Sequence, residues 1–207
     1  MWLATGKPVY RIKDHNDRVT SVCFSPDGRM ILTGCADNSL RLWETRSGRL
    51  IQTMTRHRNE VHQVSFRPDG QVIASCSSDG MIRLWDLTGD CLHTLEGHSG
   101  DVYTVAFNPD GTKLATGGKD RAINIWSWNG KIERSFEAHS AEILTVAFSP
   151  NGKMIASGSA DQSVKLWDLE GKLIKTLNGH SAEVHQVAFH PEGSTLVSVG
   201  EDHLVQF

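Results

Sequence analysis

A repeat of about 41 residues runs through the whole chain and constrains its fold more than any other feature. One histidine marks each unit, and successive marking histidines are separated by 42, 41, 41 and 41 residues. They are His15, His57, His98, His139 and His180. Five of the six prolines begin a Pro-Asp-Gly-like turn in the same register. A period of this length predicts one repeat domain of five structural units.

Each unit reads as four short β-strands. The first strand alternates in polarity at 184–189. The second is represented at 154–157 and runs to Asp161, the third lies at 164–167, and the fourth follows Gly171, at 172–177. In the turn after the first strand, proline presets φ and glycine accepts the positive φ that closes a hairpin. No segment has helical periodicity. Four strands per unit predict one blade of a β-propeller.

The units resemble WD40 repeats, and the resemblance covers the whole chain. The dipeptide that gives the family its name is intact in two units and altered in two, as Trp85-Asp86, Trp167-Asp168, Trp43-Glu44 and Trp126-Ser127. A Gly-His pair is present at Gly97-His98 and Gly179-His180. The resemblance implies an all-β WD40 β-propeller built from five four-stranded antiparallel blades around a central channel.

The resemblance also implies a buried hydrogen-bond chain in each blade, from tryptophan through serine or threonine and histidine to aspartate. The matching sets are Trp43, Thr33, His15 and Asp37; Trp85, Ser75, His57 and Asp79; Trp126, Thr116, His98 and Asp120; and Trp167, Ser157, His139 and Asp161. Such Ser-His-Asp sets could suggest a hydrolase. A catalytic triad, however, needs one exposed nucleophile and an oxyanion hole, so repetition along the chain indicates a structural role.

The fifth unit supplies His180, Ser198 and Asp202, and Trp2 is expected to complete it from the other end of the chain. Trp2 lies 41 residues before Trp43. Residues 1–207 are predicted to form one domain with repeats at about 15–56, 57–97, 98–138, 139–179, and 180–207 plus 2–14. The N-terminal strand, 6–12, is expected to close onto the C-terminal blade or to be exchanged between chains. WD40 rings usually have seven blades, so a five-bladed ring, an assembly of chains and a piece of a larger propeller all stay open.

One edge of the propeller is the candidate partner-binding rim. The resemblance places partners where the histidine and aspartate turns emerge. The rim residues are Arg18, Glu60, Asp101, Glu142, Glu183, His62, Tyr103, Leu144 and His185. Their carboxylates predict a site for a Lys/Arg-bearing peptide, with Tyr103 and Leu144 as apolar anchors. The alternative is a set of solvated edge charges with no selected ligand.

Composition excludes several other classes. The net charge is −3 and no Lys/Arg run is present, which disfavours nucleic acid. The longest apolar run has four residues, so no membrane span is expected. Cys23, Cys35, Cys76 and Cys91 form no CxxC pattern and indicate small core or edge residues in a reducing compartment, so we expect a cytoplasmic protein. No cofactor is expected, and no metal, because His62 and His185 lie in non-adjacent units without a visible third ligand.

The function that the resemblance implies is that of a non-catalytic protein-interaction scaffold. One alternative is an engineered or excised propeller fragment with no function beyond folding and assembly. Another is a five-bladed glycoside hydrolase with carboxylates in the channel. The acids of this chain recur at one repeat position at the channel mouth, which favours the scaffold.

Overall fold

The computed structural model describes residues 11–207, and this part of the chain is built from antiparallel β-strands without helices. The first two sheets contain β1 (Val19–Phe24), β2 (Met30–Cys35), β3 (Leu40–Glu44) and β4 (Leu50–Met54), then β5 (Val61–Phe66), β6 (Val72–Ser77), β7 (Ile82–Asp86) and β8 (Cys91–Leu95). The next two contain β9 (Val102–Phe107), β10 (Lys113–Gly118), β11 (Ala122–Ser127) and β12 (Ile132–Glu137), then β13 (Ile143–Phe148), β14 (Met154–Ser159), β15 (Val164–Asp168) and β16 (Leu173–Leu177). The fifth contains β17 (Val184–Phe189), β18 (Leu196–Gly200) and β19 (Val205–Gln206).

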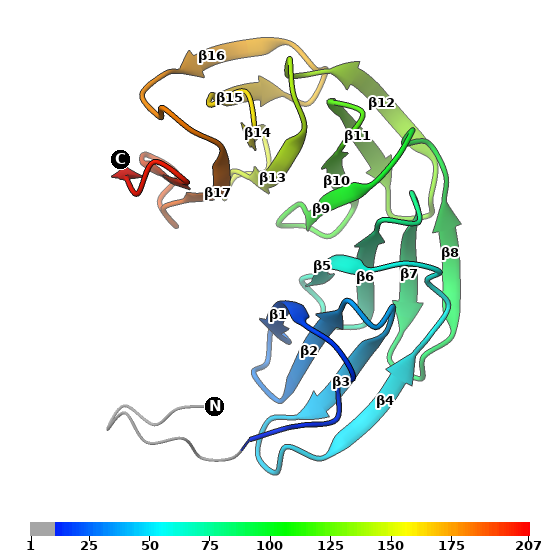
Figure 1. Ribbon diagram of the computed structural model, residues 1–207. Coiled ribbons are helices and arrows are strands. Elements are labelled where there is room, and N and C mark those ends of the chain that lie inside the picture. The colour runs from blue at the N-terminus through cyan, green and yellow to red at the C-terminus, as the bar shows by residue number, and fades with distance from the viewer. Residues whose placement is uncertain (1–10) are drawn as a thin grey trace.

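These sheets are the five blades of a β-propeller, which confirms the predicted fold class. They follow one another along an arc, with β1, β5, β9, β13 and β17 on its inner side (Figure 1). The fifth blade has three strands among the described residues. Trp2 and most of the expected fourth strand, 6–12, lie outside the described residues, so closure or exchange by that strand stays a prediction.

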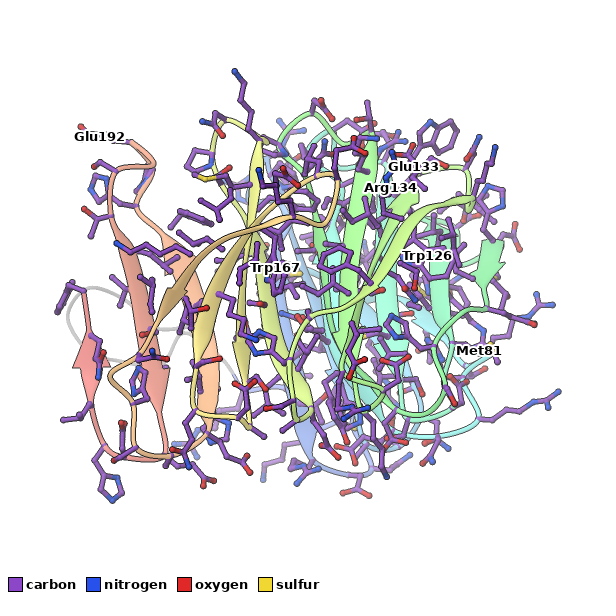
Figure 2. All side chains as sticks on the ribbon, turned by 90° about the horizontal axis from the view of Figure 1, so that it is seen from above. Met81, Trp126, Glu133, Arg134, Trp167 and Glu192 are labelled. Carbon is purple, nitrogen blue, oxygen red and sulfur yellow. The ribbon has the colours of Figure 1, made fainter. Side chains whose placement is uncertain are left out.

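The hydrophobic core lies between the blades. Val61, Val64 and Phe66 of β5 pack against Leu40 and Leu42 of the preceding blade. The same repeat positions form the next three interblade cores. Figure 2 shows Trp126 and Trp167 within the body of the arc, with Glu192 at one edge and Met81 toward the other. The second, third and fourth blades are thus covered on both faces by their neighbours, and the core repeats with the sequence.

The described residues form an open arc. Along the inner side β1 packs on β5, β5 on β9, β9 on β13, and β13 on β17. The first and last blades lie at the two ends of the arc (Figure 1). Val19, Val22 and Phe24 of β1 are exposed, although their counterparts in β5 are buried. The sequence did not decide whether the five blades close into a ring. In the described part of the chain, no contact between β1 and β17 closes one.

Candidate functional site

A buried hydrogen-bond chain from tryptophan to aspartate crosses the second, third and fourth blades. In the first blade the chain runs from Trp43 through Thr33 to His15, and Arg41 lies between His15 and Asp37. In the second blade the indole Nε1 of Trp85 donates to Ser75 Oγ at 2.9 Å, and Ser75 Oγ lies 2.7 Å from His57 Nε2. His57 Nδ1 lies 3.0 Å from Asp79 Oδ2. Because an indole N–H only donates, the serine hydroxyl accepts from Trp85 and gives its own proton to His57. Nδ1–H of His57 then donates to Asp79.

Among the tryptophan, serine, histidine and aspartate of the second blade, only the aspartate is charged. Burial opposes ionisation of Asp79, but hydrogen bonds from His57, the Arg58 backbone and Arg83 hold the pKa of Asp79 well below its usual range. Burial lowers the pKa of His57. His139 and Asp161 shift in the same directions. A neutral imidazole beside a carboxylate is a stable, fully paired arrangement.

The hydroxyls of these sets cannot act on a substrate from solvent. Ser75, Thr116 and Ser157 are completely buried. Each already accepts a proton from an indole N–H and bonds a histidine. The geometry therefore supports the structural role of the Ser/Thr-His-Asp sets and gives no exposed nucleophile in them.

Two arginines extend the chain in a way that the sequence interpretation missed. Arg83 Nη1 donates to Asp79 Oδ2 at 2.8 Å, and Arg41 Nη1 donates to Asp37 Oδ2 at 2.9 Å. Both arginines lie four residues after the turn aspartate, and both are buried. The third blade has Asn124 in this place, and its side-chain amide donates to Gly97 O instead. The sequence signal that could have revealed these arginines is the Asp-x-x-x-Arg spacing, which recurs in the first two blades.

The fifth blade holds its histidine and aspartate in the same way. His180 Nδ1 lies 2.8 Å from Asp202 Oδ2, and its Nε2 lies 2.8 Å from Ser198 Oγ. A cavity of about 360 Å³ borders Ser198 and His180 and is also lined by Leu196, Gln206 and Phe207, among others. In the other blades this serine or threonine accepts from a tryptophan. The assignment of Trp2 to this place stays a prediction, because Trp2 lies outside the described residues.

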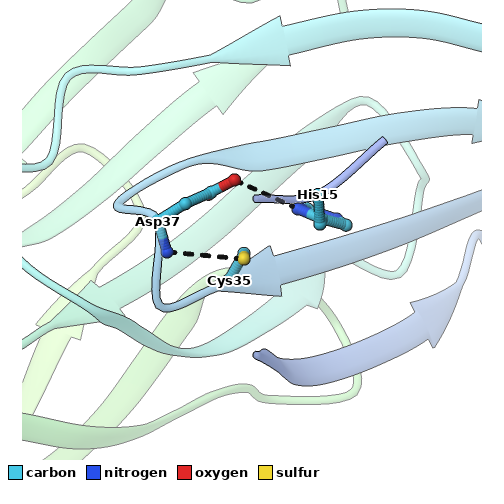
Figure 3. A group of neighbouring side chains, drawn as sticks. All are labelled: His15, Cys35 and Asp37. Carbon is cyan, nitrogen blue, oxygen red and sulfur yellow. Dashed lines mark hydrogen bonds and ion pairs between the residues drawn. The ribbon is translucent and has the colours of Figure 1, made fainter. Parts of the chain in front are cut away.

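The first blade brings His15, Cys35 and Asp37 together (Figure 3). His15 Nδ1 lies 3.7 Å from Asp37 Oδ2, and the backbone N–H of Asp37 donates to Cys35 Sγ at 3.4 Å. One ligand atom from each residue lies within 4.8 Å of the others. The guanidinium of Arg41 contacts both His15 and Asp37, however. A cation fixed in that position repels a metal ion, so we interpret this group as part of the structural chain.

On the candidate rim, the first three blades are linked by polar contacts. Arg18 forms an ion pair with Glu60 of the next blade. His62 Nε2 lies 2.7 Å from Ser78 Oγ, and Ser78 donates to Asp101 Oδ2 of the third blade at 3.2 Å. Glu60 is thus already neutralised within the chain, which the sequence did not reveal.

Tyr103 lies at the centre of the rim. Its ring packs edge-on against His62, with 5.0 Å between the ring centroids. Burial, and then the neighbouring Glu142 carboxylate, raise the pKa of Tyr103 to about 12. Asp101 and Glu142 are half-buried and have no cationic partner among the described residues. Leu144 follows on the fourth blade and is also half-buried.

The rim ends on the fifth blade in a cluster of two acids and a histidine. His185 Nε2 lies 3.3 Å from Glu201 Oε1, and Glu183 offers a ligand atom within 4.8 Å of both. The structure therefore brings carboxylates to His185, although the sequence showed no third ligand. Glu201 comes from a different turn, which is why spacing along the chain did not reveal it. His62 belongs to another blade and does not join this cluster.

The four cysteines are free, and Cys35 and Cys76 are buried. Burial raises the pKa of Cys76 well above its usual range, which makes that thiol unreactive. No helix in the described part of the chain is long and apolar enough to cross a membrane.

Four four-stranded blades that each hold a tryptophan, a serine or threonine, a histidine and an aspartate, followed by a blade with three described strands, define a repeat β-propeller with a polar rim. The family model described as "WD domain, G-beta repeat" matches residues 6–44, 48–86, 89–127, 130–168 and 171–207. The chain belongs to the WD40 family.

Individual relatives match over roughly one repeat. The chain is 45% identical to ribosome assembly protein 4 of Saccharomyces cerevisiae over 51 residues, which is 25% of this chain and 10% of that protein. It is 50% identical to human WD repeat-containing protein 38 over 46 residues, covering 21% of this chain and 15% of the relative. Human coronin-2B is 42% identical over 50 residues, or 24% and 10% of the two chains. The matched segments are thus small parts of these relatives.

Proposed function

We propose that this chain is a protein-interaction platform that binds a Lys- or Arg-bearing peptide on its rim, beside Tyr103. The observation that supports this most is the placement of two carboxylates, Asp101 and Glu142, next to a half-buried aromatic ring. Neither carboxylate has a cationic partner in the described part of the chain. Half-buried acids beside an aromatic anchor suit a cationic side chain on a short apolar stem.

The peptide site is narrower than the one expected from the sequence. Glu60 is paired with Arg18 and has little remaining attraction for a ligand. Leu144 offers apolar contact next to Glu142 on the fourth blade. We therefore assign the basic side chain to Asp101 and Glu142, and an adjacent apolar residue of the peptide to Tyr103 and Leu144.

A peptide-binding experiment tests this function. Fluorescence anisotropy with basic peptides selected from an array would compare the wild-type chain with Asp101→Asn and Glu142→Gln. Each substitution is expected to weaken binding up to about fivefold, since a solvent-accessible ion pair contributes up to ~1 kcal/mol. Glu96→Gln, at an exposed carboxylate just after β8, is the control and should bind as the wild type does. Absence of binding that depends on Asp101 and Glu142 would leave the rim as solvated edge charges.

A further inference from the structure

The two ends of the arc carry the two halves of one more interblade core. The leading face is formed by Val19, Val22 and Phe24 of β1. Val22 is 64% exposed and Phe24 is 57% exposed, whereas Val64 and Phe66, their counterparts in β5, are 3% and 8% exposed. These two positions are one repeat apart and have the same residue types. The leading face therefore has the composition of an interblade core without the blade that would cover it.

The opposite end supplies the other half. The trailing face is formed by Val197, Val205 and Phe207 of the fifth blade. Val205 is 57% exposed, whereas Val164, its counterpart in the fourth blade, is 2% exposed because β17 packs on it. Since all four internal interfaces join a trailing face to a leading face, the two end faces are complementary by repetition.

A repeated hydrogen bond predicts the same partners. At each internal interface a side chain on one inner strand accepts from the backbone N–H of a valine on the next. The four pairs are Ser21 with Val64, Gln63 with Val105, Thr104 with Val146 and Thr145 with Val187. One repeat further, the acceptor is Gln186 on β17 and the donor is the N–H of Val22 on β1. No described residue supplies a partner for the Gln186 side chain, which is exposed.

Rim side chains of opposite charge would meet where a fifth blade is followed by a first blade. Within the chain, Ser78 contacts Asp101 of the following blade, and Arg18 contacts Glu60 of the following blade. Glu201 has the repeat position of Ser78, and Glu183 has that of Arg18. If a first blade followed the fifth blade, both acids would therefore face Arg18 of that first blade. Arg18 is the one base at a position where the other four blades have acids. Its side chain is 70% exposed, so it can reach an incoming carboxylate as well as Glu60.

From these observations we propose that the leading face of one chain packs on the trailing face of a second copy, with Arg18 of one chain between Glu183 and Glu201 of the other. The open arc separates the two faces within the described residues, and the match between Arg18 and the two acids of the fifth blade selects a second copy as the occupant. Such a contact is head-to-tail: two copies can close into a ring through two such contacts, or more can continue as an array. This surface is distinct from the peptide site at Asp101 and Glu142.

One residue of the trailing blade departs from the internal interfaces. Val199 has the repeat position of Gly34, Gly117 and Gly158, where an added Cβ would meet the next blade at 2.6 to 2.9 Å. The second blade accommodates Cys76 there, within a buried core. We infer that the contact between copies is looser than an internal one. Val199→Gly should therefore tighten it.

Sedimentation velocity and light scattering on the 207-residue chain test the proposal. Mass is expected to rise with concentration from 22.9 kDa to a multiple of it. Glu201→Arg and Arg18→Glu should each weaken association by about tenfold, because each places like charges in contact, and the double variant should restore it. Glu96→Arg is the charge-matched control, because Glu96 is exposed and lies just after β8 in the second blade, which is at neither end of the arc. This variant should associate as the wild type does.

Several outcomes would overturn the proposal. One is a mass of 22.9 kDa at every concentration. Another is an oligomer whose dissociation constant Glu201→Arg leaves unchanged, or a double variant as weak as the single ones. Tighter association of Val199→Gly supports the assigned register, and no tightening contradicts it. Far-UV circular dichroism of each variant establishes that the blades are intact before masses are compared.

Discussion

Each turn aspartate is ionised inside the protein because several donors converge on it. In the second blade those donors include His57, the backbone N–H of Arg58 and the guanidinium of Arg83. In the third blade His98 and the backbone N–H of Ser99 contact Asp120, but Asn124 replaces the arginine. The two blades therefore differ by one buried cation beside an otherwise similar carboxylate. That difference allows the role of the carboxylate to be separated from the role of the arginine.

We predict that Asp79→Ala destabilises the fold more than Asp120→Ala does. Both substitutions remove the carboxylate that pairs with a buried histidine, at a cost of about 1–3 kcal/mol. Asp79→Ala also leaves the buried Arg83 without its carboxylate, and breaking a buried ion pair costs roughly 3–5 kcal/mol. Urea denaturation followed by tryptophan fluorescence would measure the free energies of unfolding. Equal losses for the two variants would show that Arg83 contributes nothing through Asp79.

The sequence predicted the members of these chains but not the arginines. A strand with alternating polarity suggests that Arg41, between Leu40 and Leu42, points to solvent. In the structure all three residues are buried. Leu40 and Leu42 pack against β5 of the next blade. The guanidinium of Arg41 contacts His15 and Asp37 of its own blade. Alternation therefore distinguished the two faces of the strand without showing that both are covered. The same limit hid the pairing of Arg18 with Glu60, which lie 42 residues apart on neighbouring blades.

At the scale of strands, the sequence predicted strand bounds best where turn residues flank the strand. The first strand of the fifth blade was expected at 184–189 and is β17, Val184–Phe189. The strand expected after Gly171, at 172–177, is β16, Leu173–Leu177, which begins one residue later. The second strand of the fourth blade was expected to run from Met154 to Asp161, and β14 ends two residues earlier, at Ser159. Turn chemistry is local, whereas the last pairs of a strand depend on the neighbouring strand.

The approach of neighbouring blades depends on glycine at one strand position. Gly158 on β14 faces the next blade, and a Cβ at this place would lie 2.7 Å from Val184 Cγ1 and 2.8 Å from Thr145 Cγ2. Both atoms belong to packed side chains of inner strands. Gly158→Ala is therefore expected to overpack the core between the fourth and fifth blades and to lower stability by about 1–3 kcal/mol.

Thermal unfolding would measure the effect of Gly158→Ala. Lys153→Ala, at an exposed position in the turn before β14 of the same blade, introduces the same side chain on the surface and should change stability by less than ~0.5 kcal/mol. If Gly158→Ala unfolds at the temperature of the wild type, the interface adjusts freely and glycine is not required there.

For the whole molecule, local sequence does not determine burial. Val22 and Val64 are the same residue at the same repeat position, in strands that pair with their own blades in the same register. One is exposed and the other buried only because β1 has no preceding blade in the described chain. The repeat thus predicted every blade, but no pattern within a repeat could predict that the arc stays open. The curvature of the arc is set by the angles at which neighbouring blades pack, and these depend on all the interblade interfaces.

This matched pair gives a prediction that separates folding from association. Val64→Glu places a carboxylate in the core between the first two blades and should destabilise the fold by more than ~3 kcal/mol, as an unpaired buried charge does. Val22→Glu places the same group on the leading face, where it stays solvated in one chain. The free energy of unfolding measured at low protein concentration should then change by less than ~0.5 kcal/mol, while self-association is lost. Destabilisation of the dilute chain by Val22→Glu, to the extent seen for Val64→Glu, would mean that a segment of the same chain already covers this face.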